Sequence, residues 1–156
     1  MIRFSARYNA LIDDKGRVVL PVAFKKAMGE LAEEPLVIEK DIYKSCLNIF
    51  PQQYWDQRLE RIEKQLNQFD ENDDELLAEL YENFTTLTMA PNGRINIPSD
   101  FMEHAGIAKD VRDVIFVGKG QSITLWNEKI YEEAKQTRKP LRDMVRDRLS
   151  NHTEND

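Results

Sequence analysis

The sequence predicts an α+β protein in which two copies of one small unit interleave to form a single pseudo-two-fold β-barrel. The first observation is a repeat, because DDKGRVVLP at 13–21 returns as APNGRINIP at 90–98, with the glycines Gly16 and Gly93 lying 77 positions apart. The second is that each copy runs through the same order of turn, strand, short helix and strand pair. The third is physical: a unit of several short strands exposes edges that a second copy can pair.

The first copy opens with a strand, since residues 2–13 alternate between apolar and polar at the period of a half-buried strand. The side chains expected to face the core are Ile2, Phe4, Ala6, Tyr8, Ala10 and Ile12, and those expected to face outward are Arg3, Ser5, Arg7, Asn9, Leu11 and Asp13. Gly16 allows the tight turn that follows. A helix is predicted between Pro21 and Gly29, and two strands at 36–39 and 46–50.

The second copy follows the same plan, with a strand at 85–90, a turn closed by Gly93 and a strand at 94–97. Asp100 and Glu103 fit a capping box for a helix that ends at Gly106. Two further strands are predicted at 114–118 and 122–126. The segment GKGQS between them lacks the spacing of a phosphate-binding loop and is predicted to be a hairpin turn.

Helices are predicted between the copies and after them. Trp55, Leu59, Ile62, Leu66 and Phe69 recur at helical spacing, and after DENDDE at 70–75 a second helix continues from Leu76 to Phe84. Two interpretations stay open: an antiparallel helix pair laid on the barrel, which is the default, or a surface that also meets neighbouring subunits. A third helical stretch, interrupted by Pro140, follows Asn127.

These elements divide the chain into five parts. We expect a first repeat at 1–51, a helical linker at 52–84, a second repeat at 85–127, a C-terminal helical segment at 128–149 and a flexible tail at 150–156.

Composition excludes several classes of protein. Hydrophobic residues make up 41% and charged residues 32% of the chain, as in soluble globular proteins. A single cysteine, Cys46, rules out an internal disulfide framework and a thiolate zinc site, and two histidines, His104 and His152, supply no histidine-rich metal centre. The sequence shows neither a membrane-spanning apolar run nor a signal peptide. We therefore expect a cytoplasmic protein without metal, cofactor, membrane partner or small-molecule substrate.

Charge is unevenly distributed along a chain whose formal net charge is −6. Residues 1–29 carry six basic and two acidic side chains, whereas residues 56–82 carry three basic and ten acidic ones. Because a steering field depends on where charge lies, the chain is expected to have one basic and one acidic face.

The basic side chains of the first copy suggest a nucleic-acid contact. Arg3, Arg7 and Arg17 share the outward parity, and Lys15 lies in the turn between the strands. Lysine and arginine neutralise phosphates, and an arginine on a strand or turn can read guanine in the major groove of double-stranded DNA. Two alternatives remain for Arg17: a surface ion pair with Asp13, or an arginine that Asp13 orients for its base contact.

With its paired motifs DDKGRVVLP and PNGRINIP, and with DIYKSCLNIFP at 41–51 and HAGI at 104–107, the chain closely resembles the MraZ family, which carries two AbrB/SpoVT-type DNA-binding units. The family motif D-x-x-x-R is intact from Asp13 to Arg17. In the second copy Arg94 is present, but Ala90 stands where the acid is expected and Asn92 matches Lys15.

The resemblance implies a bacterial transcriptional regulator of the division and cell-wall gene cluster. It also implies a ring-shaped homo-oligomer, often octameric, that binds tandem promoter repeats and associates with the nucleoid. The residues expected to bind DNA are Arg3, Arg7, Lys15 and Arg17, and those expected to be structural are Asp13, Gly16, Gly93 and Arg94.

Two other functions receive less support from the sequence. An antitoxin-like protein of the same superfamily would have a toxin as partner, but such proteins usually carry one unit and a long flexible tail. An enzyme is disfavoured because no carboxylate pair, nucleophile–base set or metal cluster is visible in the sequence. Cys46 and His104 are expected to be structural, as are the aromatic residues, and the arginines at 138–148 are expected to form a solvated helix face.

Overall fold

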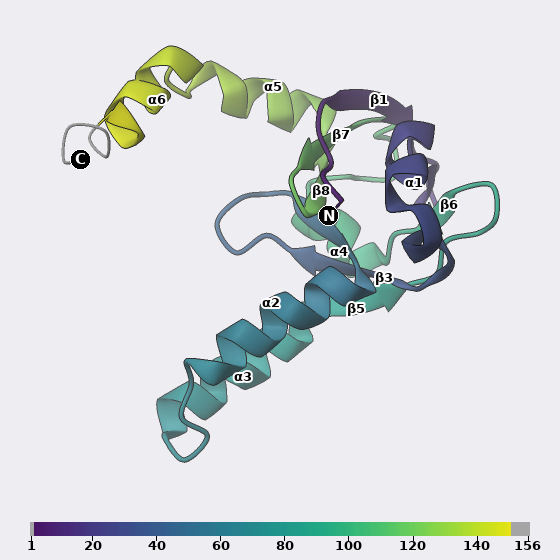
Figure 1. Ribbon diagram of the computed structural model, residues 1–156. Helices are drawn as coiled ribbons and strands as arrows, with labels where there is room; N and C mark the ends of the chain where they lie inside the picture. Colours follow the sequence, from purple (N-terminus) through teal and green to yellow (C-terminus); the bar gives the residue numbers. More distant parts are fainter. Residues whose placement is uncertain (1, 151–156) are drawn as a thin grey trace.

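The fold was analysed in a computed structural model, which describes residues 2–150. Six antiparallel strands form one sheet in the order β1-β7-β8-β4-β3-β5, and β2 and β6 form a separate two-stranded ribbon (Figure 1). The strands are β1 Arg7–Leu11, β2 Arg17–Val19, β3 Leu36–Lys40, β4 Leu47–Pro51, β5 Phe84–Leu87, β6 Arg94–Asn96, β7 Asp113–Lys119 and β8 Ser122–Asn127. The helices are α1 Val22–Met28, η1 Gly29–Glu33, α2 Gln52–Lys64, α3 Glu71–Glu82, α4 Ser99–His104, α5 Glu128–Gln136 and α6 Leu141–Arg148.

The order of the strands confirms that the two copies are interleaved. Strand β1 of the first copy pairs with β7 of the second, and β5 of the second copy pairs with β3 of the first. Exchanging the copies turns the sheet order into its own reverse, with the pair β4–β8 at the centre. The same exchange maps β2 onto β6, which are partners in the ribbon. Neither copy has a complete sheet of its own, so each one supplies an edge to the other.

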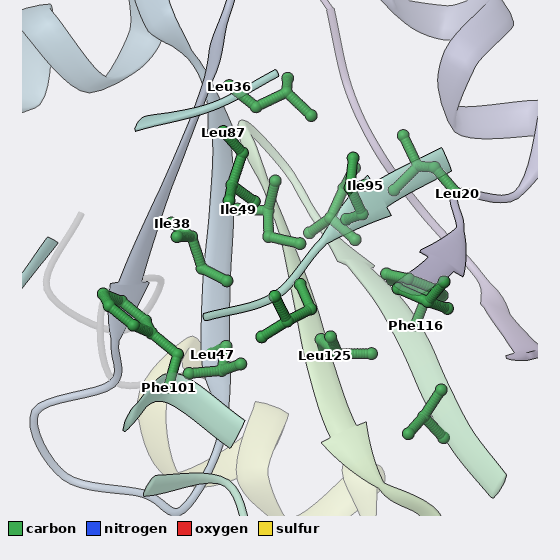
Figure 2. Packing of buried hydrophobic residues seen from close by; sticks show 14 of the residues in the cluster. Leu20, Leu36, Ile38, Leu47, Ile49, Leu87, Ile95, Phe101, Phe116 and Leu125 are labelled. Carbon is green, nitrogen blue, oxygen red and sulfur yellow. The ribbon is translucent and has the colours of Figure 1, made fainter. Parts of the chain in front are cut away.

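The main core lies between the ribbon and one face of the six-stranded sheet. Ile95 of the ribbon points toward Phe116 and Leu125 of the sheet (Figure 2). Leu20, which directly follows ribbon strand β2, points the same way. Within residues 2–150, ribbon and sheet are linked by one backbone bridge, between Ile12 and Val18. The predicted barrel is therefore closed by packed side chains rather than by a continuous hydrogen-bonded ladder.

The two turns of the repeat hold each other through backbone hydrogen bonds. The N–H of Ile97 donates to the carbonyl of Gly16 at 2.7 Å, and the N–H of Leu20 donates to the carbonyl of Gly93 at 2.9 Å. Both glycines have positive φ, 84° and 87°, which side-chain-bearing residues rarely adopt. A Cβ atom at Gly16 would also lie 2.4 Å from the carbonyl oxygen of Ile97. Both turns thus favour glycine for its conformation, and at Gly16 the lack of space excludes any side chain as well.

The first strand is shorter than the alternation predicts. Phe4 and Ile12 are buried as expected, but Ala6 is exposed and has a φ of 68°, so the prediction that it faces the core is wrong. The reason lies on the neighbouring strand, where a Cβ atom on Gly118 would be 2.3 Å from the backbone nitrogen of Ser5. The chain crosses β7 so closely at this point that it leaves regular strand geometry before β1 begins.

The helix pair α2–α3 projects away from the sheet as an arm, so the prediction that it lies along the barrel is wrong (Figure 1). The segment DENDDE does not interrupt the helices in the way expected, since Asp70 caps α3 and the following acids form its first turn. Carboxylates are favourable there because the first turn of a helix carries a partial positive charge.

The base of the arm is anchored on the sheet face that points away from the ribbon. Trp55 of α2 packs against Phe50 and Phe84, with ring centroids 5.2 and 4.6 Å away. Arg58 lies over Phe50 and forms an ion pair of 3.2 Å with the buried carboxylate of Glu39. Burial raises the pKa of Glu39, which the Asn48 amide and Arg58 partly oppose.

Two helix starts differ in how they are capped. The capping box predicted at Asp100 is absent because α4 begins directly after Pro98, which places Asp100 inside the first turn, where it pairs with Lys40 at 3.2 Å. Helix α5, in contrast, starts where the sequence predicts, with the Asn127 side chain accepting hydrogen bonds from the N–H groups of Lys129 and Ile130. Beyond Pro140, α6 continues away from the sheet (Figure 1).

The predicted hairpin at 118–122 is confirmed as the connection between β7 and β8, where Lys119 pairs with Ser122. Residues 151–156 of the predicted flexible tail, with His152, lie outside the described residues. Among the helices at 2–150, none has the length and apolar content that a membrane span needs.

We predict that Gly118→Ala destabilises the fold by about 1–3 kcal/mol, because the added methyl group meets backbone atoms of Phe4 and Ser5. The measurement is the free energy of unfolding from urea titration. Gly120→Asn is the matched control: Gly120 also lies in the β7–β8 hairpin, has open space around it, and has a positive φ that asparagine tolerates. A Gly118→Ala protein as stable as wild type would contradict the close crossing.

Candidate nucleic-acid interface

The ribbon β2–β6 presents one face to the core and one to solvent. Val18 and Ile95 point inward and are buried. The outward face carries four exposed residues in two cross-strand pairs, Arg17 opposite Asn96 and Val19 opposite Arg94. Because the alternation of a strand assigns successive residues to opposite faces, packing of Val18 and Ile95 fixes both arginines outward.

The first turn is organised by the carboxylate of Asp13. Its Oδ1 accepts hydrogen bonds from the N–H groups of Lys15 at 3.0 Å and Arg17 at 2.8 Å, and its Oδ2 accepts from Nε of Arg17 at 2.6 Å. The Arg17 backbone N–H is the strongest of the groups that hold the pKa of Asp13 below its ordinary value. Asp13 therefore ties the backbone of the first turn to the side chain of Arg17.

The same contact shows the ion pair of Arg17 with Asp13, whereas the base contact of Arg17 stays a prediction. Asp13 engages Nε only, and the side chain of Arg17 is 44% exposed. In the part of the chain that the structure describes, the two terminal nitrogens of the guanidinium make no hydrogen bond. The ion pair therefore exists, and it holds the guanidinium with its outer edge toward solvent. That edge is the part that binds guanine O6 and N7 or a phosphate in bidentate fashion.

Lys15 and Gly16 form the tip of this turn. Gly16 is buried beneath it, whereas the Lys15 side chain is exposed and has no ion-pair partner among residues 2–150. A lysine at such a position is a mobile point charge next to the oriented Arg17.

The second turn is built differently. Ala90 offers no carboxylate, and the side chain of Asn92 instead accepts the hydrogen bond from the N–H of Arg94 at 3.0 Å. Arg94 is exposed, and within the described residues its guanidinium makes no hydrogen bond or ion pair. Its structural role stays a prediction, and its position on the outward face matches that of Arg17.

Lys25 is a further cation at this surface that the sequence analysis did not single out. It extends from α1, and its Nζ donates a hydrogen bond to the carbonyl of Pro91 in the second turn. The repeat could have indicated this position, because Lys25 and Met102 are equivalent residues of the two copies. Each follows the glycine of its own turn, Gly16 or Gly93, at the same spacing. Met102 lies against Gly16, and Lys25 correspondingly lies against Gly93.

The structure does not gather all four predicted DNA-binding cations in one place. Arg7 contacts α5, where it forms an ion pair of 2.8 Å with Glu132 and lies 5.2 Å over the ring of Tyr131. It stands six residues before Asp13, about 20 Å along an extended chain. Arg3 is exposed before the kink at Ala6. Lys15 and Arg17 form one site with Arg94 and Lys25, and Arg3 and Arg7 lie apart from it.

The geometry suits a duplex. A two-stranded antiparallel ribbon fits the major groove of B-DNA, and side chains on its outward face reach the base edges. We define the ribbon surface as Lys15, Arg17, Lys25, Arg94 and Asn96. Its cations outnumber the neighbouring acids Asp13 and Asp14, although the whole chain is acidic.

Comparison with known proteins agrees with this geometry. The family model described as "MraZ protein, putative antitoxin-like" matches residues 4–78 and 80–151. The chain belongs to the MraZ family.

Relatives in the MraZ family match most of the chain. A protein named Transcriptional regulator MraZ from Bacteroides fragilis is 30% identical over 151 residues, which cover 94% of each chain. The protein of the same name from Phocaeicola vulgatus is 30% identical over 132 residues, covering 85% of this chain and 84% of the relative. The one from Legionella pneumophila is 28% identical over 129 residues, covering 82% of each. The two family matches each contain one of the two turns that meet in the ribbon.

We predict that Asp13→Asn lowers the free energy of unfolding at neutral pH, and that the difference from wild type disappears in acid. The pKa of Asp13 is depressed in the folded protein, so its stabilisation is present above the unfolded value of about 4 and is lost as the pH falls through the folded value. Urea titrations across the acidic range measure this. Asp14→Asn, an exposed neighbour, is the control; an Asp13→Asn difference that persists unchanged in acid contradicts the prediction.

Proposed function

We propose that the protein is a DNA-binding regulator of transcription that inserts the β2–β6 ribbon into the major groove. The observation that carries this proposal is Arg17, held at Nε by Asp13 with the outer edge of its guanidinium exposed on a ribbon of groove-fitting width. The names of the relatives, which are transcriptional regulators, support it.

The residues of the ribbon surface have separate roles in this proposal. Arg17 reads a base edge, because its orientation is fixed before binding and little side-chain entropy is lost. Lys15 neutralises an adjacent phosphate. Arg94, in the second copy, contacts the duplex with less specificity because no carboxylate orients it. Lys25 adds a positive charge beside the second turn. Arg3 and Arg7 contact the phosphate backbone of the DNA outside the ribbon surface in this proposal.

A single ribbon carries few cations and would bind DNA weakly. We therefore propose that several protomers act together as a closed homo-oligomer on tandem promoter repeats. Each neutralised phosphate contributes about −0.9 to the slope of log affinity against log salt, and linked sites add avidity. We further propose a ring on the promoter of the division and cell-wall gene cluster, in the nucleoid region of the cytoplasm, as the family resemblance implies.

Two surfaces of the protomer support self-association. Helix α6 has no buried residue and exposes Leu141 and Val145, and Leu149 is exposed directly after it; the helix carries three arginines and two aspartates. The arm exposes Leu76 and Tyr81 in an acidic segment. Apolar surfaces at different ends of a protomer allow a head-to-tail contact, and such contacts form a ring when the rotation between protomers closes.

A toxin partner is the alternative function, and the family description contains the term antitoxin-like. The two functions differ in what the purified protein carries. An unrelated protein that co-purifies in stoichiometric amounts favours the toxin partner, whereas a homo-oligomer that binds its own promoter favours the regulator.

We predict that Arg17→Gln weakens binding to the DNA upstream of the protein's own gene by about tenfold or more, since a bidentate base contact contributes about 1–3 kcal/mol. Arg94→Gln should have a smaller effect. Fluorescence anisotropy at fixed salt measures both, with a scrambled duplex to separate specific from non-specific affinity. Arg61→Gln, an exposed arginine on the arm, removes the same charge elsewhere. If Arg17→Gln and Arg61→Gln bind alike, Arg17 does not read DNA.

We predict that Val145→Glu lowers the mass of the assembly measured by size-exclusion chromatography with light scattering. Val145 is 42% exposed in the protomer, so the substitution leaves the core intact, but it places a charge in the proposed contact of α6. Lys129→Glu introduces a negative charge on exposed α5 and serves as control. An unchanged mass with Val145→Glu would exclude α6 from the interface.

A further inference from the structure

A cavity of about 280 Å³ opens on the sheet face that points away from the ribbon. Lys44, Lys119 and Arg138 line it together with the aromatic residues Trp126 and Tyr131. Pockets for small ligands commonly combine such an apolar wall with a few converging polar groups, and this one has the size of a small metabolite.

The cavity is separate from the ribbon surface. Along β7 and β8, Phe116 and Leu125 belong to the core beneath the ribbon, whereas Trp126 packs in a second cluster with Tyr131. Thr124 lines the cavity and, like Trp126, is a direct sequence neighbour of Leu125. The thickness of the sheet therefore stands between the cavity and the proposed DNA contact.

Three cations meet at the cavity from segments that are far apart in sequence. Lys44 comes from the loop 41–46, Lys119 from the end of β7, and Arg138 from the chain after α5. Within residues 2–150, the ion pairs of the structure do not include any of these three side chains. Like charges gathered around one concave site repel each other unless an anion binds between them.

The lining contains a single acid, Asp41, whose negative charge offsets one of the three positive charges and whose carboxylate is held in place by hydrogen bonds. Its Oδ1 accepts hydrogen bonds from the N–H groups of Tyr43 and Lys44, both at 2.9 Å, and its Oδ2 accepts from Nδ2 of Asn48 at 3.0 Å. Asp41 therefore shapes the loop that carries Lys44. The carbonyl of Lys44 is held from the other side by Nε2 of His104 at 3.1 Å.

A buried polar atom next to the cavity has no partner. Asn48 is 7% exposed and lies opposite Thr124 on the neighbouring strand, and its Oδ1 makes no hydrogen bond in the described structure. Asn48 is not among the residues that line the cavity, so of this pair Thr124 is the side chain that a bound ligand meets. Cys46, also in the lining, is buried, and burial raises its thiol pKa to about 12, so the site has binding groups but no thiolate nucleophile.

We propose that this cavity binds a small phosphorylated metabolite. Arg138 and the two lysines take the phosphate group, because a guanidinium fork and ammonium groups are the usual phosphate ligands. The organic part lies against Trp126 and Tyr131, with its hydroxyl groups toward Thr124. The ligand is not DNA, so the site is an addition to the proposed regulatory function.

The test uses the position of the two tryptophans. Trp55 lies at the base of the arm and Trp126 lines the cavity, so Trp55→Phe leaves Trp126 as the only tryptophan reporter. Inorganic phosphate and ribose 5-phosphate are titrated into this protein at constant ionic strength. A saturable fluorescence change is expected with both, at lower concentration for ribose 5-phosphate, and little change with malonate.

Substitutions then locate the site. Adding Lys119→Gln and Arg138→Gln should weaken binding at least about tenfold, since each removes a charge-assisted hydrogen bond, while adding Arg61→Gln should leave it unchanged. Adding Arg17→Gln should also leave it unchanged, which separates this site from the DNA contact.

Four results overturn the proposal. One is the absence of a saturable signal in the Trp55→Phe protein. Another is equal affinity after Lys119→Gln and Arg138→Gln, and the last is malonate binding as tight as that of phosphate. A fluorescence change of the same size in a Trp126→Phe protein, where only Trp55 reports, would likewise place the anion elsewhere.

Discussion

The reciprocal hydrogen bonds between the two turns are the constraint on which the rest of the molecule depends. The carbonyls of Gly16 and Gly93, two glycines with positive φ, accept these bonds, and the donors are the N–H groups of Ile97 and Leu20, each four residues after the glycine of its own copy. These bonds fix the register of β2 against β6, and a slip by one residue would turn Arg17 and Arg94 into the core. The outward charges of the ribbon are thus a consequence of backbone geometry, which is why the glycine–arginine pair occurs in both copies.

The fold is more symmetric than its chemistry. Exchanging the copies preserves every strand pairing, yet Asp13 corresponds to Ala90, Lys15 to Asn92 and Lys25 to Met102. In the first turn a carboxylate binds two backbone N–H groups and an arginine, and in the second an asparagine two positions later binds one N–H. The backbone conformation survives this change because the glycine supplies it. One copy can therefore keep an oriented arginine while the other retains only the scaffold and an unrestrained charge.

The sequence predicts what depends on local periodicity and on the repeat, namely the strand and helix types and the interleaved pairing. It does not predict what depends on the distance between elements. Ala6 obeys the alternation in sequence but is displaced by the close crossing at Gly118, and Arg7 has the right parity but meets Glu132 of a helix 125 residues away. The direction of the arm escaped prediction because an amphipathic stripe gives the buried face of a helix and not its angle to the sheet. Alignment of the two copies could have placed Lys25 beside the second turn, whereas its position in a helix did not by itself indicate a contact with DNA.

The two proposed ligands bind on opposite sides of the sheet, which also limits the electrostatic repulsion between them. A phosphate in the cavity and a duplex on the ribbon would be divided by the sheet, its core and the ribbon, at least about 10 Å of packed protein. Mobile ions in the surrounding solvent screen exposed charges over about 8 Å at physiological ionic strength, so charges exposed on the two faces interact weakly through solvent. We therefore expect little direct repulsion between the anion and DNA. Any influence on DNA binding has to pass through shape, by changing how the loop 41–46 and the end of α5 stand relative to each other, and thus where α6 projects toward a neighbouring protomer.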